Sequence, residues 1–286
     1  MKQRVKSMKQ KRAVCINDIS CLGKCSLTVA LPIISSLGVE TVVLPTAVLS
    51  THTAFEGFTF HDLTDEIEPI KNHWAKRGEG FDCIYSGYLG SLRQISLVSD
   101  FIDTFKKEDT VVIIDPVLGD NGSLYKNFTP DFAKEMAKLC EKADVITPNL
   151  TEAAFLLSEE YVASGYSEEY IKGLLMRLSK LVAKKVVLTG ISFDEKSLGV
   201  ACFDSETEKY TYIKSDKINS MFHGTGDVWA STFTGAYVRG YSFEEAAVIA
   251  TDFTADSIRA TLDSKDEHWY GVKFELCLPK LCRKYC

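Results

Sequence analysis

Apolar runs rich in β-branched residues alternate along the chain with stretches of helical periodicity. The apolar runs end in turn residues, which predicts strands at 12–18, 39–45, 81–87, 110–116, 144–148 and 184–190. The periodic stretches predict helices at 26–38, 91–106, 131–143, 151–157 and 168–182. Pro32 lies inside the first of these, so we expect a kink or a later start there.

The pattern changes after residue 190. The segments 197–204 and 208–214 alternate polar and apolar residues, which predicts a hairpin of edge strands, and helices follow at 225–239 and 243–261. Strands that alternate with helices are joined as parallel neighbours by right-handed crossovers. The strands are apolar throughout, as expected when helices cover both faces of a sheet. The predicted fold is a three-layer α/β/α domain around a mostly parallel sheet.

We find no internal repeat and no linker rich in proline or glycine, which favours one domain over 12–286 without a separate second domain. The segment 45–66, rich in Thr, His and Phe, is the candidate for a small flap or lid. Residues 1–11 carry the one basic cluster of the sequence and are predicted to be a solvated, disordered tail.

Composition narrows the classes of function. The chain has 286 residues and a net charge of −6, and such an acidic surface argues against nucleic acid as a partner. No apolar run approaches the roughly 20 residues of a membrane helix. Several of the nine cysteines lie in apolar strands, which fits a reducing cytoplasm, and their spacing does not suggest a zinc site.

Ligands of such sheets bind at the carboxyl ends of the strands. Several polar clusters follow directly after the apolar runs: Asp18, "SGYLGS" (86–91), "DPVLGDNGSLY" (115–125), "TPNLTE" (147–152), "LTG" (188–190) and "HGTGD" (223–227). We expect these clusters to converge at one edge of the sheet.

The segment 224–227, "GTGD", begins a predicted helix. Amides at a helix start lack partners within the helix, and glycines let them approach an anion closely. Gly224, Thr225 and Gly226 are therefore a candidate anion hole. A carboxylate beside it is explained if Asp227 takes a proton from a hydroxyl that attacks a phosphoryl group. The alternative is a tight turn with an aspartate N-cap.

Taken with this helix start, the polar segments resemble a known family. "GTGD" at the start of a late helix resembles the ribokinase superfamily of small-molecule kinases. "SGYLGS", "DPVLGDNGSLY", "TPNLTEA" and the earlier "VLSTHTAFEG" (48–57) resemble pyridoxal kinases, and the likeness extends from about residue 12 to residue 275. "HWYGVKFE" (268–275) is similar to bacterial members described as pyridoxamine kinases.

The resemblance implies transfer of phosphate from ATP, with Mg²⁺, to the 5′-hydroxyl of pyridoxal, pyridoxine or pyridoxamine. It also implies a homodimer and allows a monovalent cation near the anion hole. It matches Asp227 to the general base and Gly224, Thr225 and Gly226 to the anion hole. It matches Asp115, Asp120 and Glu152 to acidic positions around Mg-ATP, Asn149 and Thr189 to positions near its phosphates, and Tyr125 to a loop beside the nucleotide. Around the vitamin it matches Tyr88 to an aromatic wall, and His52 and Thr53 to contacts with the substituents of the pyridine ring.

One position departs from the family. The first strand of familiar pyridoxal kinases ends in a serine that reaches the ring, whereas Asp18 stands here. The hypothesis is that Asp18 pairs with the pyridinium nitrogen or with the aminomethyl group of pyridoxamine, since opposite charges attract.

Two alternatives to a vitamin B6 kinase remain: a hydroxymethylpyrimidine (phosphate) kinase of thiamine synthesis, and a sensor that binds nucleotide or B6 on the same fold without catalysis.

Overall fold

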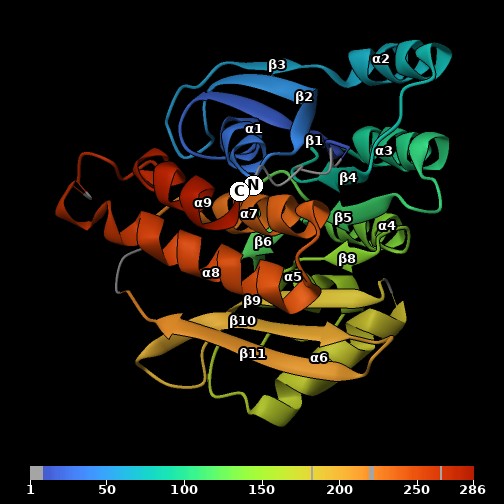
Figure 1. Cartoon of the computed structure of the whole chain (residues 1–286). Coiled ribbons are helices and arrows are strands. Elements are labelled where there is room, and N and C mark those ends of the chain that lie inside the picture. The colour runs from blue at the N-terminus through green and yellow to red at the C-terminus, as the bar shows by residue number, and fades with distance from the viewer. Residues whose placement is uncertain (1–8, 182, 219–221, 265) are drawn as a thin grey trace, which may run out of the picture.

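A computed structural model describes residues 9–181, 183–218, 222–264 and 266–286, and its centre is one large sheet (Figure 1). Within these residues the strand order is β11-β10-β9-β8-β5-β4-β1-β2-β3. The strands are β1 (Arg12–Leu22), β2 (Glu40–Thr51), β3 (Phe60–Asp62), β4 (Cys83–Ser86), β5 (Val111–Ile114), β8 (Val145–Ile146), β9 (Lys185–Ile191), β10 (Ser197–Asp204) and β11 (Lys209–Asp216). The central strands pair in parallel, whereas β3, β10 and β11 pair antiparallel at the two edges.

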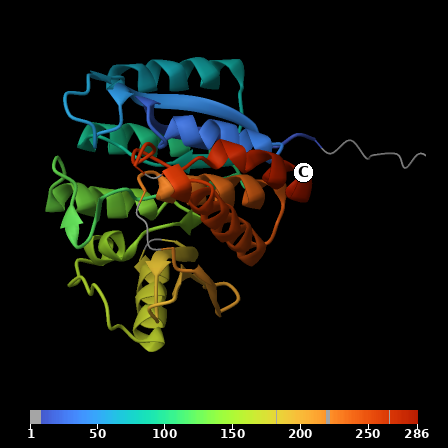
Figure 2. The same ribbon diagram turned by 90° about the vertical axis from the view of Figure 1, so that its left-hand side faces the viewer.

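Helices cover both faces of the sheet, as the turned view shows (Figure 2). One face is packed by α2 (Thr64–Arg77), α3 (Leu92–Phe105), α4 (Pro130–Cys140), α5 (Leu150–Leu157) and α6 (Glu168–Leu181). The other is packed by α1 (Leu27–Ser36), α7 (Thr225–Arg239), α8 (Phe243–Arg259) and α9 (Leu278–Tyr285). Short elements complete the chain: the hairpin of β6 (Gly119–Asp120) and β7 (Ser123–Leu124), and the 3-10 turns η1 (Leu262–Ser264) and η2 (Phe274–Leu276).

The central strands are apolar because each buries both of its faces. In β1, Val14 and Ile16 contact the core under α2–α6, while Ala13 and Cys15 contact the core under α1, α7 and α8. Successive side chains of a strand point to opposite faces, so alternate residues enter separate cores. The predicted three-layer α/β/α class is confirmed.

The first two strands are longer than predicted. β1 continues past Asp18 to Leu22 and β2 continues to Thr51, and the two stay paired in parallel. The register shifts beside Asp18, where two residues of β2, Thr46 and Ala47, oppose this one residue of β1. Such a bulge bends the strands locally and re-aims a side chain. The segment 45–66 forms the far part of β2, a loop, β3 and the first residues of α2.

Other elements differ from expectation in smaller ways. α2 and α9 were not among the predicted helices. Pro32 lies within α1, which begins at Leu27, one residue after the predicted start. Of the predicted tail, residues 1–8 lie outside the described residues, and Lys11 forms an ion pair of 2.8 Å with Asp82. Among the helices of the described residues, none has the length and apolar character needed to span a membrane.

Candidate active site

The parallel strands bring the predicted site residues to one edge of the sheet. Asp18 lies in β1, and Asp115 directly follows β5. Asn149 and Thr189 form an isolated parallel bridge beyond β8. The start of α7 carries Asp227 and lies over this side of the sheet (Figure 1). The expected convergence of polar clusters is therefore present.

Two glycines at the start of α7 have different roles in packing. Gly224 adopts φ 74°, and a Cβ there would overlap the carbonyl oxygen of Lys24. Glycine is required at this position by both the backbone conformation and the close approach. Gly226 instead faces open space, with nothing within 4 Å of the position of a Cβ. The first turn of α7 thus leaves room on its Gly226 side.

Asp227 is a partly buried carboxylate in this first turn. Burial raises its pKa to about 8, and the charges of Asp115 and Asp18 add to the rise, while a backbone hydrogen bond from Ser26 opposes it. A carboxylate with such a pKa is a far stronger base than an ordinary aspartate. Asp115 and Asp18 are therefore both close enough for their charges to act on Asp227.

Asp115 and Glu152 form a buried acidic pair. Burial raises the pKa of Asp115 to about 7, although Thr147 Oγ1 donates a hydrogen bond of 3.2 Å to Asp115 Oδ1. Burial, and then the charge of Asp115, raises the pKa of Glu152 well above its usual range. Two buried carboxylates close enough for the charge of one to act on the other offer oxygen ligands of the kind that a hard divalent ion prefers.

Other residues that the resemblance matches to the nucleotide or the metal lie at the start of α5 and on or beyond the β6–β7 hairpin. Asn149 and Glu152 form a capping box at the start of α5, and Asn149 Nδ2 also donates to Gly119 O at 2.9 Å. Asp120 is exposed on the β6–β7 hairpin, and Tyr125 is 45% exposed beyond it. Within the described residues, no three His, Cys, Asp or Glu side chains are grouped as a metal site. A magnesium ion held by one or two carboxylates and by phosphate needs no such group.

Asp18 is buried among hydroxyl groups. Ser20 Oγ donates to Asp18 Oδ2 at 2.9 Å, and Ser26 Oγ donates to Asp18 Oδ1 at 2.6 Å. Burial raises the pKa of Asp18, whereas these two hydrogen bonds lower it. Asn17 Oδ1 accepts the backbone N–H of both Asp18 and Tyr88, each at 3.0 Å. Asn17, which the motif analysis missed, therefore ties β1 at Asp18 to the loop after β4 that carries Tyr88.

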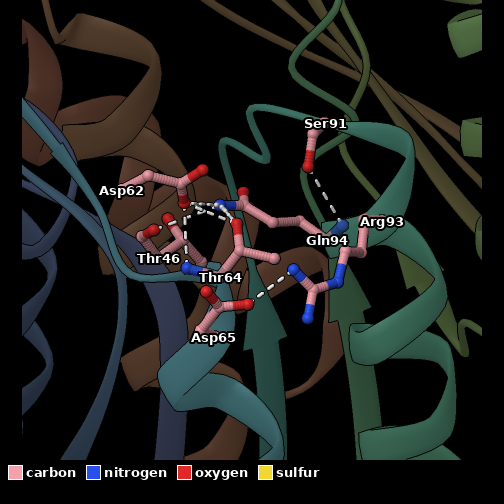
Figure 3. Close-up of polar contacts among 7 residues, drawn as sticks. All are labelled: Thr46, Asp62, Thr64, Asp65, Ser91, Arg93 and Gln94. Carbon is pink, nitrogen blue, oxygen red and sulfur yellow. Dashed lines mark hydrogen bonds and ion pairs between the residues drawn. The ribbon is translucent and has the colours of Figure 1, made fainter.

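The "SGYLGS" loop around Tyr88 is held from its other side by Gln94, whose contacts with Thr46, Asp62 and Thr64 are drawn in Figure 3. Gln94 Oε1 accepts the Gly90 N–H at 2.7 Å, and Nε2 donates to Thr46 O at 3.1 Å and Thr64 Oγ1 at 2.8 Å. Gln94 is 2% exposed. A buried amide with its bonds satisfied fixes local geometry. It links the Tyr88 loop to β2 and to the start of α2.

His52 is buried with both ring nitrogens engaged. Nε2 lies 3.0 Å from the Tyr270 carbonyl oxygen, and Nδ1 accepts the Ala54 N–H at 3.2 Å. A carbonyl only accepts, so Nε2 carries the proton and the ring is neutral. Burial also lowers the pKa of His52. Both ring nitrogens are therefore already bonded within the protein, while Thr53 is exposed in the following loop.

An aromatic cluster surrounds His52. The rings of Phe55 and His223 lie 4.9 Å and 5.1 Å from it between centroids, and Trp269 lies 4.5 Å from Phe55. Trp269 and Tyr270 come from the "HWYGVKFE" segment, far along the chain. This segment therefore contributes to the surroundings of the predicted vitamin pocket, which its residue types alone did not indicate.

Comparison with known proteins identifies the family. A family model described as phosphomethylpyrimidine kinase matches residues 34–271, and the chain belongs to this family of kinases. A Bacteroides thetaiotaomicron protein provisionally described as a phosphomethylpyrimidine kinase is 42% identical, and its crystal structure superposes with a TM-score of 0.93 over 97% of this chain and 96% of that one. Another crystal form with that description, solved with pyridoxal, is also 42% identical, with a TM-score of 0.91 over 96% of each chain.

Relatives with pyridoxal kinase names agree with this assignment. The Lactobacillus plantarum pyridoxal kinase structure is 27% identical, with a TM-score of 0.88 over 96% of this chain and 97% of that one. Pyridoxal kinase from Dictyostelium discoideum is 26% identical over 80% of this chain and 78% of its own. The resemblance to pyridoxal kinases of the ribokinase superfamily, predicted from the motifs, is confirmed.

Proposed function

We propose that this kinase transfers the terminal phosphoryl group of ATP to the 5′-hydroxyl of a B6 vitamer, with Asp227 as the general base. One observation carries the proposal: Asp227 stands at a glycine-bordered helix start with a pKa raised to about 8, near Asp115 on one side and Asp18 on the other. In this proposal, the nucleotide lies on the Asp115 side of Asp227 and the vitamer on the Asp18 side. The relatives named as pyridoxal kinases support the choice of substrate.

The base acts on the attacking alcohol. Asp227 takes the hydroxyl proton as the oxygen bonds to the phosphorus, and the bond between that phosphorus and the bridging oxygen of ADP breaks. The leaving ADP keeps the electron pair of the broken bond. A proton acceptor with a pKa near the working pH accepts the proton most effectively.

The amides at the start of α7 are assigned to the moving phosphoryl group. Gly224, Thr225 and Gly226 present N–H groups that have no partners within the helix. Fixed donors directed at developing negative charge need no reorganisation during the reaction. The open space beside Gly226 leaves room for phosphate oxygens to approach.

Asp115 and Glu152 would hold Mg²⁺ with the phosphates of ATP, and Asp120 would contact it from the hairpin. When bound, this ion neutralises phosphate charge during transfer. Asn149, Thr189 and Tyr125 are assigned to the surroundings of the nucleotide. Because the side chain of Asn149 is used in the α5 cap and on Gly119, we assign it to shaping the loop that faces the phosphates. A monovalent cation near the anion hole remains part of the proposal.

On the vitamin side, Tyr88 and His52 are assigned as ring surfaces, and Thr53 as a polar contact at the pocket rim. Asp18 is assigned to a cationic group of the vitamer. Its carboxylate has two serine partners but no basic side chain bonded to it among the described residues. A cationic ligand would supply the missing charge.

A hydroxymethylpyrimidine kinase is the second candidate, because the family model carries a phosphomethylpyrimidine kinase description. A sensor without catalysis is less well supported, because a binding module needs no base at position 227. We also propose a cytoplasmic homodimer, with residues 12–286 as the kinase domain and residues 1–11 as a disordered tail.

The function is tested by a coupled assay of ADP release with pyridoxal, pyridoxine, pyridoxamine and hydroxymethylpyrimidine, with and without Mg²⁺. We expect release with at least one B6 vitamer at a kcat/KM above that for hydroxymethylpyrimidine, and loss of release without Mg²⁺. A preference for hydroxymethylpyrimidine would support the second candidate. No release with any of the four alcohols would support the sensor.

A further inference from the structure

The loop 23–26 contacts both Asp18 and the start of α7, which carries Asp227. Ser26 is buried, and its Oγ donates a hydrogen bond of 2.6 Å to Asp18 Oδ1. In the same loop, the carbonyl oxygen of Lys24 lies where a Cβ of Gly224 would stand, at the start of the helix that carries Asp227. One short loop thus touches the proposed vitamin contact through Ser26 and the helix start that carries the proposed base through Lys24.

Ser26 holds this position in a backbone conformation that is rare for a residue with a side chain. It has φ 55° and ψ −137° at the N-cap of α1. A serine at an N-cap usually accepts a hydrogen bond from the helix, but Ser26 makes no such bond and gives its hydroxyl to Asp18. Strain of this kind persists only where the surroundings enforce it.

The surroundings that enforce it meet at Lys24. Its carbonyl oxygen fills the space that a Cβ of Gly224 would occupy, and its Cβ does the same at Gly271. Its ammonium group pairs with Glu275 and lies 5.2 Å from the centre of the Phe274 ring. The loop 23–26 is therefore clamped between the start of α7 and the segment 271–275, which belongs to "HWYGVKFE".

We infer that Ser26 is a positioning residue that sets Asp227 and Asp18 relative to each other, so that the proton acceptor and the vitamer are aligned. The inference rests on the proposed function, because alignment matters only if Asp227 acts as the base. Ser26 is not assigned to contact substrate. Small errors in such alignment reduce the rate strongly.

The test compares Ser26→Ala and Ser26→Gly with Ser20→Ala. Both Ser26 variants lose the hydroxyl on Asp18, but only glycine relieves the positive φ and frees the loop. Ser20→Ala is the matched control, because it removes the other hydroxyl on Asp18 while Ser20 lies in β1, outside the loop 23–26. The measurements are kcat and KM for pyridoxal and for ATP, together with Tm.

We expect kcat to fall about tenfold in Ser26→Ala and further in Ser26→Gly, with the KM for ATP unchanged. The Tm of Ser26→Gly should be no lower than that of Ser26→Ala, because glycine relieves the backbone strain. The variant with the lower kcat would then be the one without strain. Ser20→Ala should keep kcat within about threefold of the wild type.

Two results would overturn the role of Ser26. One is a kcat within about twofold of the wild type in both Ser26 variants, and the other is a kcat that falls only in step with Tm. A purely structural residue would give the second result. A wild type that releases no ADP with any B6 vitamer would refute the proposed function, and this inference with it. Unchanged Ser26 variants of an active wild type would refute the inference alone.

Discussion

The raised pKa of Asp227 predicts that Asp227→Asn makes the protein inactive but more stable. In the folded protein this pKa is about 8, against an ordinary value of 3.8. Below pH 3.8 the carboxyl is protonated in both the folded and unfolded states, so it has no differential effect. As the pH rises from about 4 to 8, the unfolded chain loses the proton first, and the folded state becomes progressively less stable. Above about pH 8 this penalty is complete.

The size of the penalty follows from the shift. At about 1.4 kcal/mol per pH unit, the difference between 8 and 3.8 sets an upper bound near 6 kcal/mol. Solvent reaches the partly buried carboxylate, and Asp115 also has a raised pKa, so part of the mutual repulsion is relieved. We expect Asp227→Asn to gain about 3 kcal/mol at pH 8.5 and about 1 kcal/mol at pH 5.

The assay is urea unfolding of the wild type and Asp227→Asn at pH 5, 7 and 8.5, without nucleotide or divalent cation. The free energy of unfolding is compared at each pH, and ADP release is measured in parallel. Asp216→Asn is the matched control, because Asp216 is 97% exposed at the end of β11. Its substitution should change the free energy of unfolding by less than about 0.5 kcal/mol at every pH.

The pattern across pH decides the outcome. A gain that grows from pH 5 to pH 8.5 supports a buried, uncompensated carboxylate at position 227. If Asp227→Asn is less stable than the wild type at pH 8.5, or if its gain does not change with pH, Asp227 does not have the raised pKa. The case for a strong base would then be lost.

Substitutions at Asp18, at His52 and at the two glycines at the start of α7 test other parts of the site. Asp18→Ser should lower kcat/KM for pyridoxamine about tenfold relative to kcat/KM for pyridoxal, because a charge-assisted contact is lost. An unchanged ratio of the two values in the ADP-release assay would exclude a cationic partner for Asp18. His52→Phe should keep kcat within about tenfold of the wild type, and its free energy of unfolding should fall by about 2 kcal/mol, because the protein itself uses both ring nitrogens. An equal loss of kcat in His52→Phe and His52→Ala would instead indicate a polar role of His52 toward substrate. Gly224→Ala should lower the free energy of unfolding by about 3 kcal/mol, because its Cβ would overlap the Lys24 carbonyl. Gly226→Ala should fold normally and raise the KM for ATP. Equal melting temperatures for the two variants would contradict this difference.

The order of strands and helices was predictable because both strand faces are buried. The apolar runs therefore contrast sharply with the amphipathic helices between them. α2 was missed because its sequence has Pro69 near its middle and only three buried residues. The extensions of β1 and β2 were missed because the polar residues Asn17 and Asp18 look like the end of a strand, although the chain continues in pairing beyond a bulge.

The site was predictable where function follows position at a strand end or a helix start, as it does for Asp115 and Asp227. It was not predictable where a residue acts through a distant partner. The tautomer of His52 is set by Tyr270, which is 218 residues away. The strained loop at Ser26 depends on Gly224 and on the segment 271–275, and only the folded chain brings them together.

A single-turnover experiment tests most directly whether Asp227 is the base. Enzyme loaded with ATP labelled in the γ-phosphate and Mg²⁺ is mixed with excess pyridoxal, and labelled pyridoxal 5′-phosphate is quantified after rapid quenching. We predict transfer by the wild type and a rate about 1,000-fold lower in Asp227→Asn, with ATP affinity unchanged. Transfer by Asp227→Asn at a rate within about tenfold of the wild type would show that another group accepts the proton.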